Sequence, residues 1–369
     1  MDFSFSETQR MLLDSAKSFL ENEAKNLARE MEKTDEGYSR ELWHKMAELG
    51  WIGVVFPEEV GGIDGSFLDL TLLIAETGKA LFPGPFIPTV ISGLSILHYG
   101  NESQKKDILP KVVEGKFILS PALTEPDPAI AGGRTEEKVS KRNENYILSG
   151  TRLFVPFGHI ADLLIYDADT DNGKTLFLID TNSPGITCTP LDSIAADKPC
   201  EVNLEEVEVS RSDILGEIGK GDEIIGKMKK WGALAQSAFV AGMLEQVLKM
   251  TVVYAKEREQ FGRPIGSFQA IQHQCADMAT DVDRVKFLTY QAAWKLSEDL
   301  PAEKDISMAK AWASDASRRV CLLGVKIHGG NGISEEHDMQ LYFRRAKACE
   351  VAFGDSYFHR EIIAQELGL

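Results

Sequence analysis

The sequence predicts a mainly α-helical protein with a β-domain in the middle of the chain. Apolar residues recur at helical spacing over the first 117 residues and again from about residue 219 to the end. Between these parts, short runs of β-forming residues alternate with clusters of Asp, Asn, Gly and Pro, which favour turns. We therefore expect an N-terminal helical domain over 1–117, a middle β-barrel or sandwich over 118–218, and a C-terminal four-helix bundle over 219–369.

The N-terminal part opens with a capping-box pattern. The Ser6 hydroxyl and the Gln9 amide, three residues apart, can each satisfy an exposed backbone donor of a helix start. A turn is expected at 57–62, PEEVGG, because proline and paired glycines interrupt helical spacing there. Helical spacing then returns over 68–81 and 102–113.

The middle and C-terminal parts differ in the residue pattern and in the secondary structure that it predicts. Strands are expected at 146–150, 163–166 and 175–179, and a flexible exit follows at 215–221. Helices of 25–35 residues are long for a globular protein and are typical of an up-down bundle. The long helical segments expected in this part are 222–258, 266–298, 303–328 and 337–367, the last with a break near Gly354.

Composition narrows the class of protein. The 40 basic and 57 acidic residues give a formal charge of −17, which argues against a nucleic-acid binder. The 5 cysteines are odd in number and lack C-x-x-C spacing, so they indicate reduced thiols and neither a disulfide framework nor a metal site. No secretory signal and no apolar run of membrane-spanning length is visible. We expect a soluble cytoplasmic protein that works without a membrane.

Two segments combine residues suited to a dinucleotide. Residues 254–272 read YAKEREQFGRPIGSFQAIQ and place a basic helix end, a Phe-Gly turn and a new helix start close together. Residues 327–333 read IHGGNGI, in which glycines permit close backbone approach. The alternatives are a solvated helix end for the basic residues and a helix C-cap for the glycines, and the C-cap can coexist with cofactor binding.

Together these segments resemble the flavin-binding segments of the acyl-CoA dehydrogenase family. The resemblance extends over the chain, because 3–9, 57–62, 104–110 and 122–126 are similar to further family motifs in the same order. It implies the family's three-domain fold, non-covalent FAD, an acyl-CoA substrate, an electron-transferring flavoprotein or similar acceptor, and an oligomer. An arginine suits the FAD pyrophosphate because its planar fork pairs with phosphate oxygens. The dinucleotide contacts that the resemblance implies are Arg258, Gln260, Phe261, Gln269, Gln272, Lys326, Gly329 and Gly330.

On the flavin-ring side, the resemblance assigns contacts to Leu123, Thr124 and Phe154. Each also has a purely structural interpretation, as a strand end or a strand side chain. Pro156 stands where a threonine hydroxyl often bonds flavin N5, and proline has no such donor. The family's Gly-rich run after Thr-Glu-Pro is replaced by DPAIA at 127–131.

The family's catalytic base is missing from both of its usual positions. A carboxylate must remove the α-proton of the acyl thioester, and most members carry this glutamate in a Tyr-Glu-Gly-Thr motif near the C-terminus. Here 351–356 reads VAFGDS, with Phe353 at the glutamate position. A minority of members place the base earlier, which corresponds to about Gly232. Asp355 is the nearest acid, although it also fits the N-cap of the next helix, and Glu350 is a weaker candidate.

The sequence leaves three functions open. The leading one is a subunit of a heteromeric acyl-CoA dehydrogenase for a bulky or unusual acyl-CoA, in which a homologous chain supplies the base. The second is a homomeric relative with altered chemistry, desulfinase- or oxidase-like. The third is a structural subunit that is not catalytic. The acyl group and the physiological acceptor are not determined by the sequence.

Overall fold

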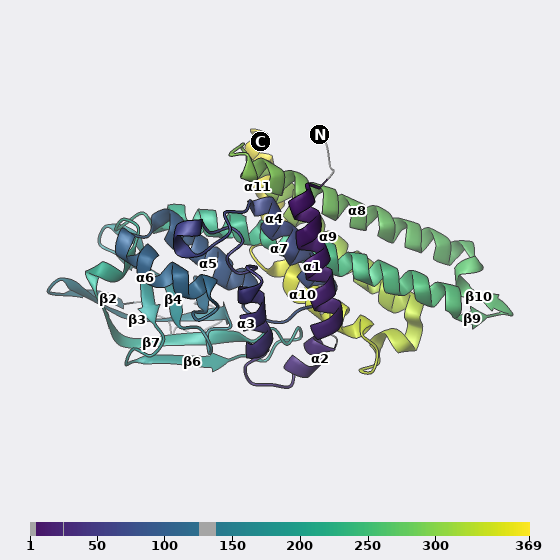
Figure 1. Cartoon of the computed structure of the whole chain (residues 1–369), viewed down its shortest axis with the longest axis horizontal. Helices are drawn as coiled ribbons and strands as arrows, with labels where there is room; N and C mark the ends of the chain where they lie inside the picture. Colours follow the sequence, from purple (N-terminus) through teal and green to yellow (C-terminus); the bar gives the residue numbers. More distant parts are fainter. Residues whose placement is uncertain (1–4, 25, 125–137) are drawn as a thin grey trace. The chain divides into compact units, whose positions relative to one another are not determined.

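Long helices, two four-stranded β-sheets and a two-stranded hairpin make up the computed structural model, which describes residues 5–24, 26–124 and 138–369 (Figure 1). The chain divides into two units. The helical unit comprises Met1–Glu30, Ser66–Phe82 and Gly232–Leu369, and the mixed unit comprises Met31–Gly65 and Pro83–Trp231. The predicted domain boundaries near 117 and 218 stay a prediction. The helices are α1 (Glu7–Glu23), α2 (Leu27–Met31), α3 (Arg40–Glu48), α4 (Phe67–Lys79), α5 (Phe86–Tyr99), α6 (Glu102–Val113), α7 (Gly221–Glu257), α8 (Gln269–Ser297), α9 (Glu303–His328), α10 (Met339–Val351) and α11 (Ser356–Glu366).

Helix α9 lies at the centre of the helical unit, where it packs on α8, α10 and α11. Helices α1, α4, α6, α7, α8, α9 and α10 start within a few residues of the predicted positions, whereas α2, α3 and α5 were not predicted. The capping box of Ser6 and Gln9 is present at α1, and a second one, of Ser66 and Asp69, begins α4. Both supply side-chain partners to backbone donors that a helix start leaves unpaired.

Two glycines let α4 and α7 touch through their backbones. A Cβ atom on Gly78 of α4 would lie 2.0 Å from the carbonyl oxygen of Phe239. One on Gly242 of α7 would lie 1.7 Å from the carbonyl oxygen of Ala75. Any side chain at either position would push the two helices apart, so this contact depends on glycine.

The mixed unit holds two four-stranded sheets. Their strand orders are β1-β4-β5-β8 and β2-β3-β7-β6. Most neighbours pair antiparallel, but β1 pairs parallel with β4. The strands are β1 (Leu119–Ala122), β2 (Lys138–Arg142), β3 (Asn145–Pro156), β4 (Leu163–Thr170), β5 (Gly173–Asp180), β6 (Ile186–Pro190), β7 (Pro199–Val209) and β8 (Ile214–Leu215).

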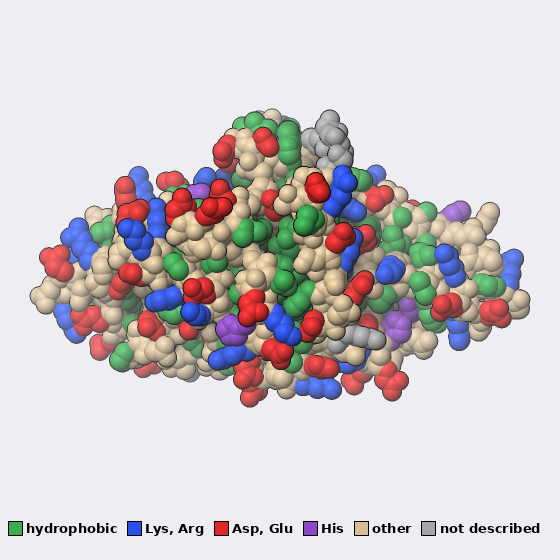
Figure 2. Space-filling view, viewed as in Figure 1, with side chains coloured by type: hydrophobic (Ala, Val, Ile, Leu, Met, Phe, Trp, Pro, Cys, Tyr) green, Lys and Arg blue, Asp and Glu red, His purple; other side chains and the backbone are tan. Residues whose placement is uncertain are grey.

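Helix α7 is shared by the two units and is the one described helix that is long and apolar enough to cross a membrane. Of its apolar window, 56% is buried against the rest of the chain, as in the core helix of a globular protein. On the face drawn in Figure 2, basic and acidic side chains are interspersed among apolar ones.

Candidate functional site

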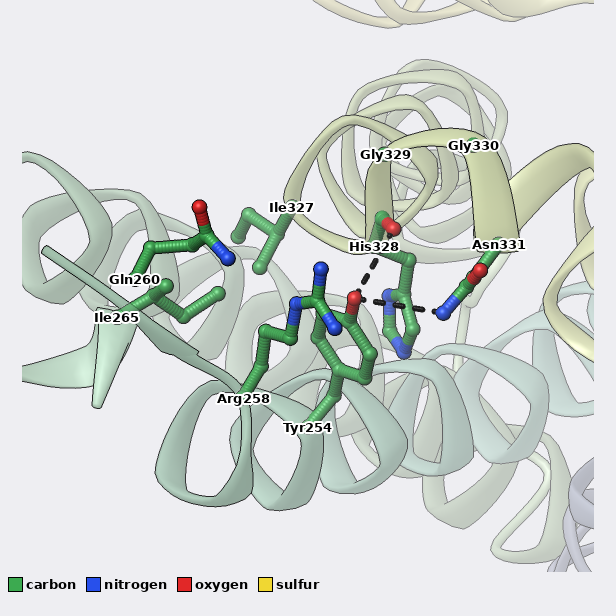
Figure 3. A pocket seen from close by; sticks show the side chains of 9 residues that line it. All are labelled: Tyr254, Arg258, Gln260, Ile265, Ile327, His328, Gly329, Gly330 and Asn331. Atoms are coloured by element: carbon green, nitrogen blue, oxygen red, sulfur yellow. Dashed lines mark hydrogen bonds between the residues drawn. The ribbon is translucent and has the colours of Figure 1, made fainter. Parts of the chain in front are cut away.

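A pocket of about 260 Å³ opens in the helical unit, where the end of α7 meets the end of α9 (Figure 3). The two-stranded hairpin of β9 (Glu259–Gln260) and β10 (Arg263–Pro264) follows α7 directly. The 3-10 helix η4 (Gly329–Ile333) continues α9. The pocket therefore joins the two segments that the sequence singled out as suited to a dinucleotide. It is lined by Tyr254, Arg258, Gln260, Ile265, Ile327, His328, Gly329, Gly330 and Asn331.

Arg258 supplies the positive charge of this pocket. Its backbone N–H donates to Tyr254 O at 2.8 Å, and its carbonyl accepts from Ile265 N at 2.8 Å, so the chain is held on both sides of it. The side chain is exposed and extends toward the pocket beside Gln260 (Figure 3). No carboxylate of the described residues forms an ion pair with Arg258. The guanidinium is therefore available to an anionic group such as a phosphate.

Gly329 and Gly330 leave the opposite wall open. A Cβ atom built on either glycine meets no heavy atom within 4 Å, so their backbone borders free space. Gly329 has φ +61° and ends α9, which confirms the predicted glycine C-cap. A ligand can approach this backbone as closely as the glycines permit. The pocket is suited to a pyrophosphate, because Arg258 offers a positive charge and the two glycines leave free space beside the backbone.

Two stacked rings, of the half-buried Tyr254 and the buried His328, line the pocket. The rings of Tyr254 and His328 stack with centroids 4.4 Å apart, and the Tyr254 hydroxyl donates to His328 O at 3.3 Å. His328 Nδ1 lies 2.7 Å from Gly324 O, and burial lowers the pKa of the imidazole. Burial and this hydrogen bond indicate that His328 packs in the fold. Tyr254 and Asn331 were missed as site residues, although both lie inside the motifs that indicated the site.

Four of the predicted dinucleotide contacts lie outside the pocket. Phe261 is 93% exposed at the hairpin tip and meets Phe268 edge-on at 6.1 Å. The Gln272 side chain donates to Gly266 O at 3.0 Å. Gln269 and Lys326 are exposed on α8 and α9. Their predicted contacts with a cofactor stay predictions.

The two positions expected to hold a catalytic base lie against each other. A Cβ atom on Gly232 would lie 2.2 Å from Cε1 and 2.3 Å from Cδ1 of Phe353. The Phe353 ring thus occupies the space into which a side chain at 232 would point. Phe353 itself has φ +56°, a left-handed conformation that is unusual for a bulky residue.

The remaining acids near this point have structural partners. The Asp355 carboxylate accepts from Phe358 N at 2.9 Å and caps α11, as its N-cap interpretation predicted. Glu350 forms ion pairs with Arg318 at 3.5 Å and Lys347 at 3.7 Å. A catalytic role for Asp355 stays a prediction.

The residues assigned to the flavin ring belong to the mixed unit. Thr124 follows β1, and its carbonyl accepts from Leu153 N at 2.8 Å. Phe154 is 62% exposed with φ +56°, at a register shift between β3 and β7 that turns it outward. Pro156 pairs with Pro199 at the strand end. The half-buried Leu123 precedes Thr124, while 127–131 lies outside the described residues.

Comparison with known proteins identifies the family. Family models for the acyl-CoA dehydrogenase N-terminal and C-terminal domains match residues 6–116 and 219–368. The chain is 32% identical over 379 residues to the probable acyl-CoA dehydrogenase YngJ of Bacillus subtilis, with 100% of both chains covered. A chain of the ChsE4–ChsE5 complex from Mycobacterium tuberculosis matches with a TM-score of 0.91 and 30% identity, covering 100% of this chain and 99% of that one. PigA with FAD and proline matches with a TM-score of 0.90 and 26% identity, over 100% of both chains.

These matches confirm the fold class and the resemblance that the motifs carried. The chain belongs to the acyl-CoA dehydrogenase family of oxidoreductases, which act on the CH–CH bond of acyl-CoA thioesters.

Proposed function

We propose that this chain is an FAD-binding subunit of a heteromeric acyl-CoA dehydrogenase and that a homologous partner chain supplies the catalytic base. The observation that carries the proposal is the Phe353 ring packed on Gly232. Neither residue can take a proton, and the ring leaves no room for a carboxylate at 232. The likeness to a chain of the ChsE4–ChsE5 complex supports an assembly of two related chains.

FAD is the cofactor that the pocket fits. Arg258 would pair with its pyrophosphate, and the backbone at Gly329 and Gly330 would border it. When bound, FAD accepts the hydride that leaves the acyl β-carbon. The protein's part is to hold the cofactor, orient the thioester and present a base to its α-proton.

The substrate we propose is a bulky or unusual acyl-CoA, and the acceptor is an electron-transferring flavoprotein or a similar carrier in the cytoplasm. The assembly is a heterotetramer of this chain with its homologue. A homotetramer would place two chains without a base side by side, so it would need another proton acceptor.

The test compares the purified chain alone with the chain co-expressed with a homologue that carries the glutamate. We expect flavin absorbance in the assembly, acyl-CoA oxidation by the assembly, and no oxidation of straight-chain acyl-CoA by the lone chain. Robust oxidation by the lone chain would refute the partner-supplied base. A chain that never acquires flavin, alone or in the assembly, would indicate a structural subunit.

Asp355→Asn separates the remaining candidate base from its structural role. Asparagine caps a helix as well as aspartate does, so the protein should keep its stability. We expect turnover of the assembly to stay within about twofold, whereas loss of a catalytic base would lower kcat by about 10²–10⁴-fold. A loss of that size with unchanged stability would make Asp355 the base.

A further inference from the structure

A lysine side chain is fully buried beneath the segment that carries Phe353. Lys310 of α9 is 0% exposed. Its Nζ donates to Gly354 O at 2.8 Å, to Glu350 O at 3.2 Å and to Cys349 O at 3.3 Å. A fourth partner, Ser314 Oγ, lies 2.7 Å away. Burying a cationic group is costly, so an amine placed at this point must make strong compensating contacts.

The partners of Lys310 explain why a cation suits this place. Cys349 and Glu350 belong to the last turn of α10, whose carbonyls have no partner within the helix. The same end of a helix carries partial negative charge, which a cation stabilises. The amine thus satisfies the end of α10 and, through Gly354, ties it to the loop that follows.

The segment held in this way contains a strained residue. Phe353 and Gly354 have φ +56° and φ +98°, and only the glycine adopts such a conformation without steric cost. His359 of α11 is also buried, and its Nε2 lies 3.0 Å from Phe353 O, while its Nδ1 lies 3.3 Å from Ser307 Oγ. Lys310 and His359 therefore hold four backbone carbonyls of this segment, those of Cys349, Glu350, Phe353 and Gly354.

We propose that Lys310 is a positioning residue of the active site, which together with His359 holds Phe353 in its left-handed conformation with the ring against Gly232. Without the amine, Phe353 relaxes toward negative φ and the ring leaves Gly232. The wall presented to the acyl thioester then changes shape. This last consequence rests on the proposed function, whereas the placement of the ring does not.

The placement is tested by fluorine NMR on protein labelled with 4-fluorophenylalanine, in which the Phe353 resonance is assigned by its loss in Phe353→Ala. Lys310→Met keeps the length of the side chain and removes its donors. We expect the Phe353 resonance to shift or broaden in Lys310→Met and to stay in place in Lys295→Met, a control on α8 whose amine pairs with Asp305. An unchanged Phe353 resonance in Lys310→Met would overturn the proposal.

A second pair of variants covers the case in which Lys310→Met does not fold. His359→Gln keeps a side-chain N–H that can reach the Phe353 carbonyl, and His359→Leu removes it. The Phe353 resonance should move in the leucine variant and return in the glutamine variant. Equal displacement in both variants would overturn the role of this hydrogen bond.

Turnover of the heteromeric assembly then tests the consequence for substrate. Lys310→Met should raise KM for acyl-CoA by about tenfold with flavin occupancy retained, and it should have less than about a twofold effect in a Phe353→Ala background. Equal losses in both backgrounds would show a general structural role and overturn the proposal. A moved resonance with unchanged KM would leave the positioning intact and count against the proposed site of substrate binding.

Discussion

Gly232→Ala should destabilise this protein, although the same change normally stabilises a helix. Replacing glycine by alanine inside a helix contributes about 1 kcal/mol to stability. At Gly232 the new Cβ atom would lie 2.2 Å from the Phe353 ring, well inside van der Waals contact. Inserting a methyl group into a filled space costs about 1–3 kcal/mol. The net expectation is a loss of up to about 2 kcal/mol.

The sign of the effect should reverse when the ring is removed. In a Phe353→Ala background the clash is absent, so Gly232→Ala should raise the free energy of unfolding by about 1 kcal/mol. The two effects differ by about 1–3 kcal/mol, which is the coupling energy between the two positions. Urea denaturation of the four proteins of this double-mutant cycle measures it directly.

Gly226 supplies a matched control on the same helix. A Cβ atom there meets nothing within 4 Å, so Gly226→Ala should stabilise both backgrounds by about 1 kcal/mol. If Gly232→Ala stabilised the wild-type protein as much as Gly226→Ala does, the Phe353 ring would not lie on Gly232. Exclusion of a carboxylate from position 232 by the ring would then no longer support the proposed absence of a base.

Three further predictions address the cofactor, the base and the buried amine. Arg258→Ala should weaken FAD binding by about 10–100-fold, since a hydrogen bond to a charged group contributes about 1.5–3 kcal/mol. Flavin fluorescence measures the dissociation constant. In the control Arg263→Ala this constant should stay within a few-fold of the wild type, because the Arg263 guanidinium lies over the Phe268 ring at 4.1 Å. Phe353→Glu should give the lone chain acyl-CoA-dependent bleaching of its flavin, whereas Phe353→Gln should not, and equal behaviour of the two would refute the assignment of this position. Burial lowers the pKa of the Lys310 amine from 10.5 to about 8, while the nearby groups of Cys349, Asp355 and Glu350 act in the opposite direction and raise it. Between these pH values the unfolded chain binds a proton that the folded chain does not. The free energy of unfolding of the wild type, relative to that of Lys310→Met, should therefore rise by roughly 3 kcal/mol from pH 8 to 10.5. A difference between the two proteins that stays constant over this pH range would contradict the prediction.

Local signals in the sequence were sufficient for the long helices and for the positions of three strands. The capping box at Ser6 and the N-cap at Asp355 each involve residues three apart, so both can be predicted from a short stretch of sequence. Helix α5 was not delimited, because its residues are apolar on every side and give no helical period. The parallel pairing of β1 with β4 was missed as well, since it joins distant segments and has no local signature.

The candidate site was predictable only where a motif carried it. Arg258 and the glycines at 329–330 lie in segments whose residue types and order indicate a dinucleotide-binding site. Lys310 gave no signal, because a lysine on a helix is normally solvated and only the tertiary fold buries it. The contact of Gly232 with Phe353 was not predicted for the same reason. Each position was identified separately, and residues so far apart in the sequence give no local sign that they are in contact in the fold.

That shared space bears on where this chain could hold a base. A Cβ atom at 232 would fall within the Phe353 ring, so this region accommodates one large side chain, from either position but not from both. The two positions that the family resemblance assigns to a base therefore cannot both carry a large side chain. With phenylalanine in place, a carboxylate at 232 has no room, and restoring it there requires removal of the ring as well. A carboxylate at 353 needs one substitution only, because Gly232 already leaves the space open. The glycine thus keeps position 353 able to hold a base, and the phenylalanine is what excludes one.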